Sequence, residues 1–123
     1  MPTEAEEQIT LFRWAEIMAN RWPELRLMHS IPNGGSSNPI EAAHLKQQGV
    51  KAGIPDIFLP VPRGQHHGLY IEMKRREGGR VRPEQRMMLE ALREQGYRCE
   101  VCKGWEAAKD VITEYMTDDE TAM

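Results

Sequence analysis

Hydrophobic residues and helix-end residues predict four helices along the chain. Apolar positions recur every three or four residues in 4–20, where Thr3 and Glu6 fit a capping box, so we expect a helix over 3–20. Asn38 and Pro39 fit the start of a short helix over 39–48. Pro83 opens a helix over 83–95 that ends at a glycine, and "WEAAKDVITEYM" predicts a closing helix over 105–116.

Four apolar runs between these helices predict strands. They are "ELRLMHSI" (24–31), "IPDIFLP" (54–60), "GLYIEMK" (68–74) and "YRCEVCK" (97–103). The turn residues of "VPRGQHHG" join the second run to the third, as in an antiparallel hairpin. The order predicts an α/β fold in which helices flank a small mixed sheet containing a hairpin and one helical crossover.

Length and composition indicate a single globular domain. The chain has 123 residues, of which 40% are hydrophobic and 28% charged, and no apolar run approaches the roughly 20 residues that a membrane-spanning helix needs. We expect one domain over 1–116 and a disordered tail over 117–123. The acidic start "MPTEAEEQ" is unlike a secretory signal, so we expect a cytoplasmic protein that does not bind membranes.

The cysteines do not indicate a metal site. Cys99 and Cys102 form one CxxC, with no second Cys or His pair at zinc-ligand spacing. Residues three apart on a strand point to opposite faces, which disfavours both a shared metal ion and a local disulfide. Ordinary thiols are the favoured interpretation.

Charge is distributed unevenly along the chain. The net charge is −3, but residues 41–86 carry nine Lys and Arg against five Asp and Glu, whereas 1–40 carry three against five and 87–123 four against nine. A localised positive block is compatible with a nucleic-acid partner, although a solvated mixed surface gives the same count.

Two of the strand runs in this positive block carry carboxylates. In "LYIEMKR" the alternation of a strand places Glu72 and Lys74 on one face, and an antiparallel neighbour would bring Asp56 of "IPDIF" close to Glu72. Two close carboxylates repel each other unless a divalent cation or a shared proton compensates, and Mg²⁺ prefers such oxygen ligands. The alternative is a salt bridge between Glu72 and Lys74 on an edge strand, with Asp56 stabilising a turn.

The order "PD…ExK" resembles the restriction-endonuclease-like superfamily, whose αβββαβ core matches the predicted elements. More closely, the chain resembles the stand-alone viral and bacterial VRR-NUC nucleases. The segments that carry this resemblance are "EEQITLFRWA", "IPNGG", "LKQQGVKAGIPDIFLPVPR", "GLYIEMKR" and "PEQRMMLEALREQGYRCEVCKGW". The sequence departs from the family in "GGRVRPEQ", which lacks a compact Val-Arg-Arg signature.

The resemblance implies roles for individual residues. Asp56, Glu72 and the Met73 carbonyl would bind Mg²⁺ or Mn²⁺, together with a first-helix glutamate that is either Glu4, which we favour, or Glu7. Lys74 would serve the attacking water, and Gln85 would lie beside the metal site. Contacts to DNA are expected from Asn33, Gly34, Lys51, Arg75, Arg76, Arg80, Arg82 and Arg86.

The function that follows from the resemblance is metal-dependent endonuclease activity on branched DNA. The resemblance implies an enzyme that acts like a Holliday-junction resolvase. Such an enzyme would be a homodimer that presents two active sites to symmetric strands. Two alternatives stay open: a DNA-binding recruitment module that does not cut, and an exonuclease or restriction-type enzyme acting on linear duplex.

Overall fold

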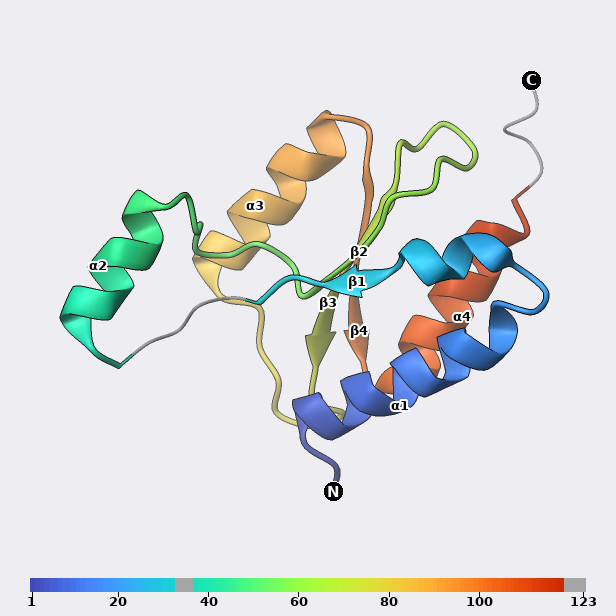
Figure 1. The fold of residues 1–123 in the computed structure, drawn as a ribbon, viewed down its shortest axis with the longest axis horizontal. Coiled ribbons are helices and arrows are strands. Elements are labelled where there is room, and N and C mark those ends of the chain that lie inside the picture. The colour runs from blue at the N-terminus through green and yellow to red at the C-terminus, as the bar shows by residue number, and fades with distance from the viewer. Residues whose placement is uncertain (33–36, 119–123) are drawn as a thin grey trace.

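A mixed four-stranded sheet with strand order β1-β2-β3-β4 organises the molecule (Figure 1). This computed structural model describes residues 1–32 and 37–118. Strands β1 (His29–Ser30), β2 (Ile57–Leu59) and β3 (Leu69–Lys74) pair antiparallel in turn, and β4 (Arg98–Lys103) pairs parallel with β3. The predicted hairpin and crossover are therefore confirmed, as is the α/β class.

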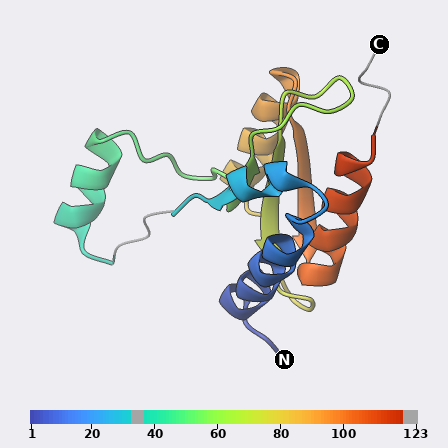
Figure 2. The same cartoon turned by 45° about the vertical axis from the view of Figure 1, so that its right-hand side comes forward.

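One face of the sheet packs against two helices to form the main core. Helices α1 (Glu4–Met18) and α4 (Trp105–Met116) lie side by side on this face (Figure 2). The alternate strand residues Ile57, Leu59, Ile71 and Met73 are at most 1% exposed beneath them. The core therefore consists of aliphatic side chains that the strands direct toward α1 and α4.

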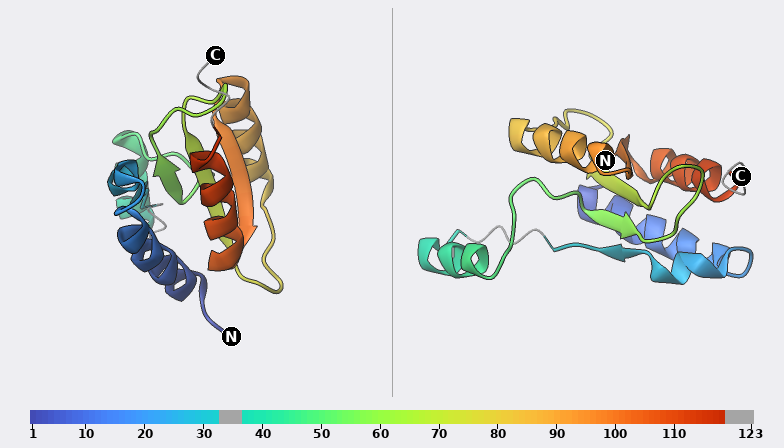
Figure 3. Two further views of the ribbon diagram at one scale, coloured as in Figure 1. Left: turned by 90° about the vertical axis from the view of Figure 1, so that its right-hand side faces the viewer. Right: turned by 90° about the horizontal axis from the view of Figure 1, so that it is seen from above.

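The opposite face is covered by α3 (Pro83–Glu94) on the β4 side, as the view from above shows (Figure 3). Its buried residues are Gln85 and Leu89. Helix α2 (Pro39–Gln47) stands away from the sheet and has no buried residue. This face of the sheet is therefore more open over β1 and β2 than over β4.

Local sequence determines where the helices begin. Thr3 and Glu6 form the predicted capping box of α1, and the Asn38 side chain accepts hydrogen bonds from the amides of Ile40 and Glu41 at the start of α2. Pro39 and Pro83 occupy the first turns of α2 and α3, where no amide donor is needed. None of the helices in the described residues is long and apolar enough to cross a bilayer.

The prediction of a strand over 24–31 is wrong for most of its length. Residues Pro23–Leu27 form a 3₁₀ helix, η1, and only His29–Ser30 pair with β2. The buried residues are Leu25 and Met28, which are three apart as a 3₁₀ turn requires, whereas Leu27 is 54% exposed. The alternation of Leu25 and Leu27 therefore indicated the two-residue period of a strand, whereas the buried positions follow the three-residue period of a 3₁₀ helix.

Both cysteines are free and buried, in agreement with the prediction of ordinary thiols. Cys102 belongs to the main core, whereas Cys99 lies outside it. Burial raises the pKa of the Cys99 thiol to about 11 and that of Cys102 to about 12. Because the thiolate is the reactive and metal-binding form, these residues are inert near neutral pH.

Candidate active site

The hairpin register brings Asp56 next to Glu72. Ile57 pairs with Ile71, so the residue before β2 lies across from the residue that follows Ile71 on β3. The Met73 amide donates a hydrogen bond of 2.8 Å to the Asp56 carboxylate, and the Ile31 amide donates one of 2.7 Å to the Asp56 carbonyl. Met73 of β3 therefore fixes the Asp56 carboxylate, and Ile31, directly after β1, fixes the Asp56 backbone.

Glu72, Lys74 and Gln85 form a buried polar network beside Asp56. They are 3%, 7% and 4% exposed. The Gln85 amide group donates to Glu72 at 3.0 Å and its carbonyl oxygen accepts from the Lys74 ammonium at 3.0 Å. The Lys74 nitrogen lies 3.3 Å from the same Glu72 oxygen. The salt bridge between Glu72 and Lys74 therefore exists, but it is buried on a central strand and not exposed on an edge strand.

The Glu72 carboxyl is electrostatically unfavourable in its ionised form. Burial, and next the nearby Asp56 charge, raise the pKa of Glu72 to about 7, against the opposing effect of Lys74. One of its oxygens, Oε1, is buried without a hydrogen-bond partner among the described residues. A buried carboxylate oxygen of this kind is costly unless a proton or a cation satisfies it.

Gly53, whose role was not predicted from the sequence, allows the loop before Asp56 to pack closely on α3. Gly53 has a positive φ of 85°, and a Cβ atom there would lie 2.5 Å from the Glu84 carbonyl oxygen and 3.2 Å from the Gln85 amide nitrogen. The loop backbone therefore packs directly on the first turn of α3, from which Gln85 projects. The signal that was available is the glycine three residues before Asp56 in "GIPD".

The structure treats the two first-helix glutamates differently. Glu7 is 2% exposed and accepts hydrogen bonds from Arg76 at 2.6 and 3.1 Å and from the Trp105 amide at 3.2 Å. These bonds lower the pKa of Glu7 and join α1 to the segment after β3 and to the start of α4. Glu4 is exposed, and the described residues contain no group of three or more His, Cys, Asp or Glu side chains placed to hold a metal ion together.

The predicted DNA contacts fall into three groups. An exposed group is made up of Lys51, Arg75, Arg80, Arg82 and Arg86. Arg76 is also exposed, but it forms ion pairs with Glu7 and Glu106, with its guanidinium over Gly104. Asn33 and Gly34 lie outside the described residues. The metal-ligand role of the Met73 carbonyl stays a prediction.

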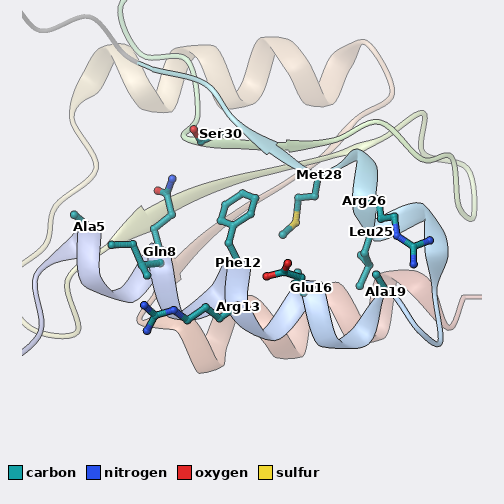
Figure 4. Close-up of a pocket in the computed structure, with 12 residues that line it drawn as sticks. Ala5, Gln8, Phe12, Arg13, Glu16, Ala19, Leu25, Arg26, Met28 and Ser30 are labelled. Carbon is teal, nitrogen blue, oxygen red and sulfur yellow. The ribbon is translucent and has the colours of Figure 1, made fainter.

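A groove of about 830 Å³ lies elsewhere, between α1 and the η1–β1 segment (Figure 4). Gln8, Phe12, Leu25, Met28 and Ser30 are among the residues that line it. None of the predicted metal-site or DNA-contact residues is among them, although Ser30 pairs with Ile57, the residue after Asp56.

Comparisons with known proteins agree with the fold and indicate the family. No match was found among curated proteins. A solved structure described as a "VRR_NUC domain protein" superposes with a TM-score of 0.84 and 31% sequence identity, covering 100% of this chain and 98% of that one. The family model of the VRR-NUC domain matches the sequence over residues 7–106, a span that includes Asp56, Glu72, Lys74 and Gln85. The chain therefore belongs to the VRR-NUC domain family and has a nuclease-type domain.

Proposed function

We propose that this protein is a divalent-metal-dependent endonuclease that hydrolyses phosphodiester bonds in DNA, with a preference for branched substrates. The observation that carries the proposal is the convergence of Asp56 and Glu72 at one end of the sheet, with Lys74 and Gln85 within hydrogen-bonding distance of Glu72. The nuclease-type domain supplies the reaction class.

The residues at this site fit Mg²⁺ or Mn²⁺. Asp56 and Glu72 provide the hard oxygen ligands that these ions prefer, and they leave room in the coordination shell for water and substrate phosphate. The unsatisfied Glu72 Oε1 and the raised pKa of Glu72 both indicate a position where a cation would relieve an unfavourable charge. When bound, such an ion polarises the phosphoryl oxygen and acidifies a coordinated water.

The protein side chains have distinct tasks in this proposal. Lys74 balances the negative charge that develops on the phosphoryl group, and its ammonium can orient a water molecule for attack. Gln85 holds both Lys74 and Glu72, so it fixes their relative position. Gln85 is itself anchored, because its carbonyl oxygen also accepts a hydrogen bond of 2.9 Å from the Arg82 amide.

The exposed basic residues support DNA as the substrate. Arg82 and Arg86 lie at the start of α3, on either side of Gln85 in sequence, and Arg75 follows Lys74 directly. Arginines at such positions contact phosphates and give salt-dependent affinity with little dependence on base sequence. Selectivity for branched DNA and a homodimeric assembly rest on the family resemblance.

A cleavage assay on a substrate panel tests the proposal. Labelled linear duplex, flap and four-way junction would be incubated with Mg²⁺ or Mn²⁺ and the parent protein, Asp56→Asn or Lys74→Ala. We expect cleavage of the branched substrates by the parent, and a loss of at least 100-fold in both variants, as is usual when electrostatic stabilisation of the reaction is removed. Binding without cleavage by the parent would instead identify a recruitment module, and cleavage confined to linear duplex would identify the other alternative.

A further inference from the structure

Aromatic rings continue the sheet face that carries the polar network. Phe58 lies two residues after Asp56 on β2, and Tyr70 lies two residues before Glu72 on β3, so all four side chains share one face. The register pairs Phe58 with Tyr70 and with His29 of β1. The Phe58 and Tyr70 rings are stacked, with centroids 4.3 Å apart and planes inclined by 22°, and His29 contacts Phe58 edge-on at 5.8 Å.

These rings differ from the side chains on the other face of the same strands. Ile57 and Ile71 are at most 1% exposed beneath α1 and α4. In contrast, Phe58 and Tyr70 are only half-buried and His29 is exposed, because α3 covers this face on the β4 side. Tyr97 meets both Phe58 and Tyr70 in T-shaped contacts, at 5.9 and 5.3 Å, so the rings belong to an aromatic cluster that is held in place while it stays partly accessible to solvent.

We propose that His29, Phe58 and Tyr70 form a stacking surface for an unpaired nucleobase beside the scissile phosphate. This inference rests on the proposed nuclease function, because Asp56 and Glu72 mark the place of the phosphate. Two residues along a strand span about 6.6 Å, and consecutive stacked bases lie about 3.4 Å apart. The rings therefore lie one or two nucleotides from the bond that is cut.

The chemistry of the rings defines the ligand. A ring can stack on any base, so the surface contributes affinity without reading a sequence. A base inside a duplex already stacks on its neighbours, whereas an unpaired base at a junction, flap or single strand has an accessible face. The surface therefore gives this chain a preference for unpaired nucleotides near the cleavage position.

The matched variants are Phe58→Leu and Phe12→Leu. Phe12 is the other phenylalanine of the chain, also partly buried, but it lines the groove beside α1. Affinity would be measured by fluorescence anisotropy in chelator, which prevents metal-dependent cleavage, on a 12-nucleotide single strand and on the same sequence as a blunt duplex. Phe58→Tyr retains an aromatic ring, and His29→Ala removes an exposed one; thermal melting of each variant monitors folding.

We expect Phe58→Leu to weaken binding of the single strand by about fivefold or more and to change duplex binding by less than about twofold. Phe58→Tyr and Phe12→Leu should bind both probes like the parent, and His29→Ala should weaken single-strand binding alone by at least about twofold. If Phe58→Leu does not fold, His29→Ala decides by the same criterion.

Equal losses on both probes, or no loss on either, would overturn the stacking surface. Failure of the parent to bind any DNA would overturn it together with the proposed function. Single-strand binding that depends on Phe58 in a protein that cuts no substrate would leave the surface standing and overturn the nuclease proposal. The two proposals can therefore fail separately.

Discussion

Replacing Gly53 with alanine tests how tightly the Asp56 loop is fitted to α3. The substitution has two effects. It places a side chain at a φ of 85°, where L-residues are strained, and it introduces a Cβ 2.5 Å from the Glu84 carbonyl oxygen. Ordinary van der Waals contact begins at 3.4 Å, so the loop and the helix must separate by nearly 1 Å.

Gly49 is the matched control, because it has a φ of 102° but nothing within 4 Å of its Cβ position. Gly49→Ala should therefore cost only the backbone strain, about 1–2 kcal/mol. Gly53→Ala should cost that strain plus about 1–3 kcal/mol of overpacking, or about 2–5 kcal/mol in total. The atoms in the way at Gly53 are backbone atoms, which cannot rotate away as a flexible side chain can. The loss of unfolding free energy should therefore be larger in Gly53→Ala than in Gly49→Ala.

Urea unfolding of the parent, Gly49→Ala and Gly53→Ala would give the free energies of unfolding, provided that the slopes agree. Nuclease activity measured under native conditions should fall in Gly53→Ala, because separation of the loop from α3 moves Asp56 away from Gln85. Equal free energies for the two alanine variants would refute the account of this contact, and so would full activity in a destabilised Gly53→Ala.

Two further predictions concern acidic residues. Glu7→Gln should lower the free energy of unfolding by about 1–3 kcal/mol, since it weakens hydrogen bonds from Arg76 to a buried acceptor, whereas the exposed Glu4→Gln should change it by less than about 0.5 kcal/mol; equal effects in urea unfolding would contradict this. Because the pKa of Glu72 is raised to about 7 from 4.5, the folded state holds a proton that the unfolded state has released, so metal-free protein should lose stability between about pH 4.5 and pH 7. Glu72→Gln should remove that part of the pH dependence. If denaturant titrations at several pH values show the same change of unfolding free energy with pH in Glu72→Gln as in the parent, the raised pKa is contradicted.

Much of the fold follows from short-range rules in the sequence. Thr3, Asn38, Pro39 and Pro83 mark helix starts through the same hydrogen bonds and fixed φ that the structure uses. Part of the site follows from an equally local rule: alternation along β3 places Glu72 and Lys74 on one face, opposite Met73 in the core. These features need no knowledge of distant contacts.

The features that escaped prediction depend on tertiary contacts. Residues 23–27 form a 3₁₀ helix because Leu25 and Met28 meet the core, and a two-residue alternation does not distinguish that from a strand. The different environments of Glu4 and Glu7 depend on Arg76, which is 69 residues from Glu7 in sequence. Neither contact can be deduced from spacing alone, because each requires the packed position of α1.

The most direct test of the account is Mn²⁺ binding, followed by electron paramagnetic resonance of the free ion. Asp56 and Glu72 approach each other at the end of β3, and we attribute this convergence to a cation site. The account predicts saturable binding by the parent protein that is lost or at least about tenfold weaker in both Asp56→Asn and Glu72→Gln, with Glu100→Gln on β4 as a control that binds like the parent. Binding that is the same in all four proteins would contradict the central claim.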